Sequence, residues 1–91
     1  EENMAANTFG TVIHDSLEAL YRPYLEKFLE PSDLDDMVKK VAQEVEFQWS
    51  QTYSPRASIT GKNYLSFEMA KEFILKFIQK EKAEINKTRN N

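Results

Sequence analysis

His14 is the single histidine of this sequence, and an imidazole can both ionise near neutral pH and bind a metal through a ring nitrogen. At ~100° per residue, it falls about 90° from the centre of the apolar face of its predicted helix, which places it at the rim of that face. Gly10, one turn earlier, has no side chain, so a backbone, a metal or a phosphate could approach His14 closely. An ordinary structural histidine beside a glycine explains the same spacing equally well.

The other residue types exclude several kinds of site. The sequence has no cysteine, so these residues hold no disulfide, zinc-thiolate site, cysteine nucleophile or iron–sulfur cluster. No serine–histidine–acid set or carboxylate pair has a spacing that nominates a complete catalytic site. No apolar run approaches the ~20 residues of a membrane span, and the acidic start does not resemble a signal peptide. We therefore expect no membrane association and a cytoplasmic location.

Composition favours one small helical domain. The 91 residues are 41% hydrophobic and 12% aromatic, which is enough for one core, and two Gly and three Pro are too few for many short strands. Residues 1–46 carry 4 basic and 11 acidic groups, whereas residues 47–91 carry 8 basic and 4 acidic groups. This asymmetry predicts helices of complementary charge, and a basic nucleic-acid face is the alternative interpretation.

Apolar spacing predicts three helices, at about 8–30, 32–52 and 63–86. Thr8 can cap the first, Pro23 predicts a kink or restart near 21–22, and the predicted apolar face continues to Leu25 and Phe28. Ser32 and Asp35 resemble a capping box for the second. The predicted buried stripe of the third contains Leu65, Phe67, Ala70, Phe73, Ile74, Phe77, Ile78, Glu81 and Ile85.

The short junction between the first two predicted helices requires them to be antiparallel, and the longer loop at 53–62 lets the third lie across both. We therefore expect an all-α fold, either a three-helix bundle or an open helical array. Residues 1–91 would form a single helical domain or a fragment of a larger one.

A motif in the first helix resembles a known family. Gly10, Thr11 and His14 form a Gly-Thr-x-x-His sequence followed by the acidic Asp15. This resembles the helix that opens the RecB-like nuclease domain of the PD-(D/E)XK superfamily. Two later segments resemble Bacteroidetes members of that family, which are similar to AddB-type exonucleases: Leu20-Tyr21-Arg22-Pro23-Tyr24-Leu25 and Gly61-Lys62-Asn63-Tyr64-Leu65. The resemblance covers nearly the whole chain.

The resemblance implies that His14 is a metal ligand, supported by Gly10 and Thr11, in a DNA exonuclease of repair and recombination that uses Mg²⁺ or Mn²⁺. In that family a later sheet supplies the catalytic acids and lysine, and a later helix supplies Gln and Tyr. The sequence contains neither acid-x-Lys nor Gln-x-x-x-Tyr. We therefore expect this chain to be the helical part of a larger α/β nuclease domain, inactive and metal-free alone. Its implied partners are DNA, the rest of that domain and a helicase, with self-association of the fragment as a further expectation.

A second hypothesis belongs to a different class of protein. The chain would be a helical interaction module without a catalytic role, and it would dock a partner through exposed aromatic residues such as Trp49, Tyr53 and Tyr64. Packing in the core is the ordinary alternative role of these three side chains.

Overall fold

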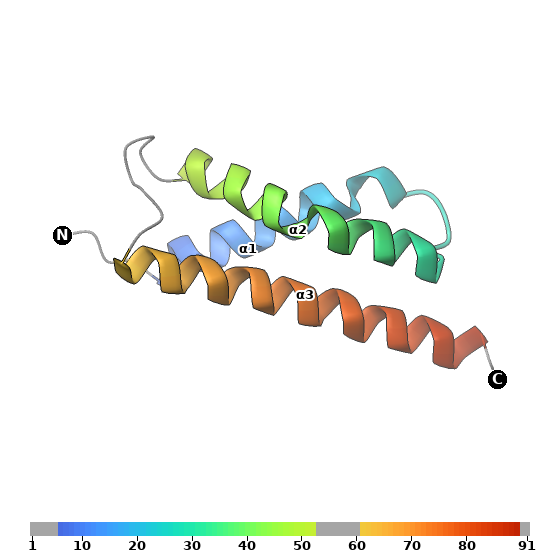
Figure 1. The fold of residues 1–91 in the computed structure, drawn as a ribbon. Coiled ribbons are helices and arrows are strands. Elements are labelled where there is room, and N and C mark those ends of the chain that lie inside the picture. Colours follow the sequence, from blue (N-terminus) through green and yellow to red (C-terminus); the bar gives the residue numbers. More distant parts are fainter. Residues whose placement is uncertain (1–5, 53–60, 90–91) are drawn as a thin grey trace.

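The fold consists of three antiparallel helices. A computed structural model describes residues 6–52 and 61–89, in which α1 spans Ala6–Tyr21, α2 spans Pro31–Thr52 and α3 spans Gly61–Arg89. The chain runs along α1, returns along α2 and runs forward again along α3, in a body of 51 × 21 × 21 Å (Figure 1). No strand occurs in the described ranges. The all-α, three-helix prediction is confirmed.

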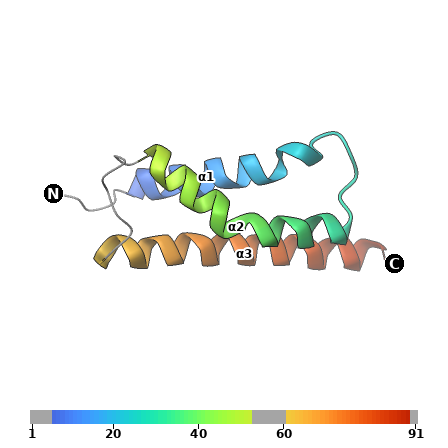
Figure 2. The same cartoon turned by 45° about the horizontal axis from the view of Figure 1, so that its top comes forward.

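The central element of the core is α2. It crosses obliquely between α1 and α3 and packs on both, whereas α1 and α3 contact each other less extensively (Figure 2). Five of its side chains are buried at helical spacing: Leu34, Met37, Val41, Val45 and Trp49. The core as a whole contains Val12, Leu20, Leu34, Met37, Val41, Val45, Trp49, Phe67, Ala70, Ile74 and Ile78. The bundle is therefore more open on the side where α1 faces α3.

The first helix ends earlier than predicted. α1 stops at Tyr21, a short 3₁₀ turn (η1) covers Arg22–Tyr24, and no helix continues to residue 30. Pro23 explains the break, because proline has no N–H for the helical hydrogen bond and its ring collides with the preceding turn. Leu25 and Phe28, expected on the buried face, are 75% and 92% exposed. The break near Tyr21 is confirmed, but the burial of these two residues is wrong.

The start of α2 is fixed by a cap two residues before the predicted one. The backbone N–H of Glu30 donates to Oδ2 of Asp33 at 3.0 Å, so Glu30 takes the capping position and Pro31 the first helical position. This replaces the predicted box of Ser32 and Asp35. Lys27 contributes an ion pair to Asp33 at 3.2 Å. The hydrogen bond from Glu30 and the charge of Lys27 hold the pKa of Asp33 below its usual value.

The buried face of α3 is narrower than predicted. Phe67, Ala70, Ile74 and Ile78 are buried, and Ile85 packs against the core. Leu65, Phe73 and Phe77, which the sequence pattern assigned to the same stripe, are 62%, 52% and 43% exposed. Neighbouring residues on a helix are ~100° apart around its axis, so Phe73 and Phe77 lie beside the buried row of Ile74 and Ile78 and not on it. That part of the prediction is wrong, and α3 keeps a half-exposed apolar row.

The opposite charges of the two halves meet at one end of the bundle. Lys82 of α3 donates to Oδ1 of Asp35 of α2 at 2.7 Å, and its Nζ forms an ion pair with the same oxygen. Both side chains are partly exposed, so this pair contributes at most about 1 kcal/mol to stability. The contact supports the interpretation of complementary helices for these two residues.

Candidate functional site

His14 projects from the open side of α1. Its side chain is 76% exposed, more than its predicted rim position suggested, because α3 contacts α1 too sparsely to cover it. Gly10 is exposed one turn earlier, and among the described residues no atom beyond its own stretch of helix lies within 4 Å of the place where a Cβ would stand. The predicted notch beside His14 is thus open space. Thr11 lies on the exposed surface of the same turn.

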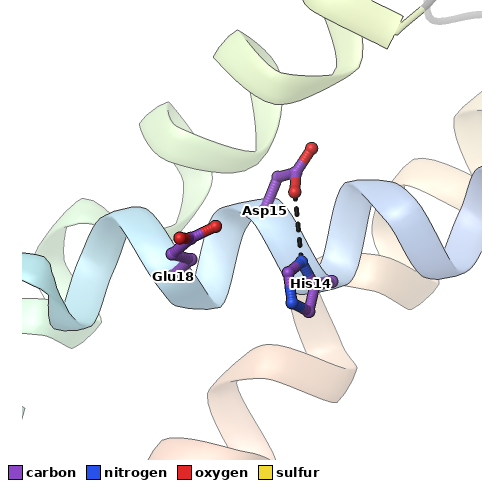
Figure 3. Close-up of side chains that lie close together, drawn as sticks. All are labelled: His14, Asp15 and Glu18. Carbon is purple, nitrogen blue, oxygen red and sulfur yellow. Dashed lines mark hydrogen bonds and ion pairs between the residues drawn. The ribbon is translucent and has the colours of Figure 1, made fainter.

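Two carboxylates stand next to the imidazole (Figure 3). One ligand atom from each of His14, Asp15 and Glu18 lies within 4.8 Å of the others. Nδ1 of His14 is 3.1 Å from Oδ1 of Asp15. When Nδ1 carries the ring proton it donates to Asp15, and Nε2 then keeps its lone pair for another partner. A carboxylate on the far nitrogen is the usual support of a metal-binding histidine.

His14 and Glu18 also border an open hollow between α1 and α3. Its volume is about 270 Å³, and its lining is His14, Leu17, Glu18, Tyr21, Phe77 and Glu81. Leu17 and the two aromatic rings form its apolar part; the rings meet edge to face, with centroids 6.3 Å apart. The phenol of Tyr21 donates to Oε1 of Glu81 at 3.0 Å. The pKa of Tyr21 is raised mainly by burial and further by the negative charge of Glu81.

A larger hollow of about 500 Å³ lies at the other end of the bundle. Its lining is Phe28, Leu29, Glu30, Glu84, Ile85 and Thr88. It offers two carboxylates and no histidine, lysine or arginine, so it lacks a pair of groups with separate acid and base roles. We therefore place the candidate site at His14.

The groups at His14 fit a divalent cation better than an anion. Imidazole nitrogen and carboxylate oxygen are both ligands that Mn²⁺ accepts, and Mg²⁺ prefers the oxygens. Among the described residues, Asp15, Glu18 and Glu81 outnumber the one cation paired with them, Arg22, which lies 3.5 Å from Glu18, so this side of the molecule keeps a net negative charge that favours cations over a free phosphate. All three candidate ligands come from one exposed stretch of α1. A usable site would need further ligands from elsewhere.

The aromatic residues expected to dock a partner differ in their exposure to solvent. Trp49 is 1% exposed and packs edge to face on Phe67, with ring centroids 5.6 Å apart. Its proposed docking role is therefore wrong, and core packing is its observed role. Tyr64 is 53% exposed. Tyr53 lies outside the described residues.

The comparisons with known proteins identify no relative. No protein-family model, curated protein or solved structure matches this chain. Across residues 6–52 and 61–89, none of the helices combines the length and the hydropathy that crossing a membrane requires.

The role of Glu18 was not anticipated from the sequence. Its spacing of four residues from His14 puts both on one side of the helix, so this signal was present. Glu81 could not be found in that way, because it comes from α3 and joins the hollow only through the packing of that helix. The motif identifies Asp15 only as its acidic residue, whereas the structure shows that its carboxylate contacts Nδ1 of His14.

Proposed function

We propose that this chain is the helical part of a metal-dependent DNA nuclease, in which His14 supplies one ligand of the metal. The observation that carries the proposal is the exposed imidazole of His14, which stands between an open notch at Gly10 and two carboxylates within 4.8 Å. The Gly-Thr-x-x-His spacing and the resemblance it supports give this arrangement its expected chemistry.

Each residue has a distinct role in the proposal. His14 would offer Nε2 to the ion, while Asp15 would hold the other ring nitrogen and so fix the tautomer. Glu18, which also forms an ion pair with Arg22 at 3.5 Å, would accept a hydrogen bond from metal-bound water. Gly10 would let the DNA backbone or another segment approach without a side chain in the way.

A divalent ion bound there would activate water and stabilise the charge that develops on the scissile phosphate. The described residues hold too few ligands for this alone, so the site would be completed by residues outside them. We expect this 91-residue chain to show no metal-dependent cleavage of single- or double-stranded DNA. It would serve DNA repair or recombination only as part of the larger domain.

The test is made in the full-length protein that carries this segment. We expect His14→Ala to lower the rate of DNA cleavage by roughly 100-fold or more at limiting Mn²⁺, with partial recovery at high Mn²⁺. Asp15→Asn should cost about 10-fold, because it weakens the support of the ring and leaves the ligand in place. The matched control is Asp36→Asn, which removes a carboxylate of α2 that is 58% exposed, against 42% for Asp15, and should leave the rate unchanged.

Stability and metal binding are measured on the same variants. His14 is exposed, so its replacement should change the free energy of unfolding by no more than about 0.5 kcal/mol. Mn²⁺ binding followed by electron paramagnetic resonance should weaken in parallel with the rate. Wild-type rates for His14→Ala at limiting metal would make the motif match coincidental, and unfolding would assign His14 a structural role.

The interaction-module hypothesis is a second candidate, and one observation favours it. Tyr64 and the apolar row of α3 are half-exposed, although Trp49 is no longer available to dock a partner. Such side chains are typical of an interface, and they need no catalytic site. Normal cleavage by His14→Ala together with a stable complex through α3 would favour this candidate.

A further inference from the structure

One side of α3 carries four apolar side chains in a row, of which the last, Phe77, also packs edge to face on Tyr21 of α1. Leu65, Met69, Phe73 and Phe77 follow each other at intervals of four residues, and each is between 43% and 62% exposed. We call them the apolar ridge. It extends over 12 residue steps, or about 18 Å of helix. A continuous exposed row of this kind is more than the scattered apolar residues of an ordinary surface.

A row of charged side chains runs directly beside the apolar ridge. Glu68, Glu72, Lys76 and Lys80 also follow each other at intervals of four, so the row is negative in its first half and positive in its second. Glu72 and Lys76 are more than 60% exposed, and their mutual contact is long, at 3.9 Å. Such surface pairs exchange partners at little cost. We call these four residues the charged row.

We propose that the apolar ridge and the charged row bind a second copy of this chain, with the two α3 helices antiparallel. The charge pattern favours a second copy of this chain as the partner, and it favours the antiparallel orientation of the two α3 helices. A two-fold axis at the level of residue 74 places Glu68 opposite Lys80 of the second copy and Glu72 opposite Lys76, each twice by symmetry. In a parallel pair the two-fold axis runs along the helices, so the charged row of one copy would face the opposite flank of its partner and these four charges would not pair with each other.

The same axis also fits the apolar ridge. At ~1.5 Å per residue, Phe73 lies about 1.5 Å from the level of the axis, Phe77 about 4.5 Å beyond it on the other side, and Met69 about 7.5 Å away. Phe77 of the second copy therefore falls between Met69 and Phe73 of the first, and the reverse holds by symmetry. One register thus satisfies the charges and interdigitates the apolar side chains, as ridges packing into grooves require.

The expected association is weak. A helix pair of this length buries less than the roughly 800 Å² per partner of a stable interface, so we expect a dissociation constant on the order of tens of micromolar. Because the charged row is exposed, its contribution should also fall as salt is added.

Sedimentation equilibrium of the purified chain between about 5 µM and 1 mM tests the proposal. We expect the average mass to rise from monomer towards dimer, and to fall again when NaCl is raised. Glu72→Lys and Lys76→Glu should each weaken the dimer by roughly 5–30-fold, because each places two like-charged pairs in the interface. The double variant Glu72→Lys/Lys76→Glu should restore it. Phe73→Glu should be monomeric throughout.

Folding is checked by far-UV circular dichroism at 5 µM. Should either single variant fail to fold, Glu68→Lys and Lys80→Glu test the same register by the same logic. A wild-type chain that stays monomeric at 1 mM overturns the proposal. So does a dimer that strengthens with salt, or one that the single charge reversals leave unchanged, because those results require another orientation or another surface.

Discussion

Two neighbouring residues of α3 should respond very differently to truncation. Ile74 is fully buried, whereas Phe73 is 52% exposed. Ile74→Ala removes three carbons from the core, which corresponds to about 2.4 kcal/mol of lost burial at ~0.8 kcal/mol per carbon. The cavity that remains raises the expected cost to about 3 kcal/mol. Phe73→Ala removes only a half-buried ring and improves helix propensity, so it should cost less than about 1 kcal/mol in the monomer.

The single tryptophan provides the assay. Trp49 is 1% exposed in the fold, so its emission should shift to longer wavelength when urea unfolds the chain. With a denaturant slope of about 1 kcal/mol per molar urea, Ile74→Ala should lower the midpoint by about 3 M and Phe73→Ala by less than 1 M. Thermal unfolding should show a loss of roughly 12–24 °C for Ile74→Ala. Protein concentrations of a few micromolar keep self-association out of the comparison.

One result of comparing these two variants would contradict the orientation of α3 described above. If Phe73→Ala costs as much as Ile74→Ala at low concentration, α3 is rotated from the orientation described, and Phe73 belongs to the core as its sequence pattern first indicated. The apolar ridge would then be packed inside the monomer and unable to meet a second copy.

Two further predictions concern ionisable groups. The N–H of Glu30 and the charge of Lys27 lower the pKa of Asp33 in the folded state. Its contribution to stability is therefore present above the usual pKa near 3.8 and is lost as pH falls through the lowered pKa. Asp33→Asn should reduce the acid-induced fall in the urea midpoint, and an unchanged fall would contradict the cap. The pKa of Tyr21 is raised, so its contribution is present below pH 10 and is lost as pH rises through the higher value. An ultraviolet titration should therefore show a tyrosine step above the usual pH 10 that Glu81→Gln moves to lower pH, whereas the absence of this late step would disprove the hydrogen bond from Tyr21 to Glu81.

The helices could be predicted where local signals and packing agree. The predicted bounds of α2, 32–52, differ from the observed Pro31–Thr52 by one residue, because its apolar residues have regular spacing and Ser32 indicates a helix start. The first helix was extended too far because the apolar pattern of Leu25 and Phe28 was followed past Pro23. Backbone chemistry decided that case, and the apolar side chains were left in solvent.

In the candidate site too, the sequence predicts what lies within one helix but not the contacts between helices. The sequence placed His14 and Gly10 on one surface of a helix, because both belong to a single helical stretch. It could not show that the side of α1 facing α3 would be open, since this depends on how α2 spaces the other two helices. The contribution of Glu81 and Phe77 to the hollow beside His14 depends on the same spacing.

The position of α2 also separates the two proposed surfaces. α2 uses its packing on both neighbours to form the core, so uncovered surface remains on α1 and on the outer side of α3. His14 and its carboxylates lie on the first, and the charged row lies on the second. Phe77 is the one residue they share, because it lines the hollow beside His14 and ends the apolar ridge. Reversing Glu72 or Lys76 should thus alter the mass of the chain without altering metal binding, and His14→Ala should do the opposite, so the failure of one proposal would leave the other standing.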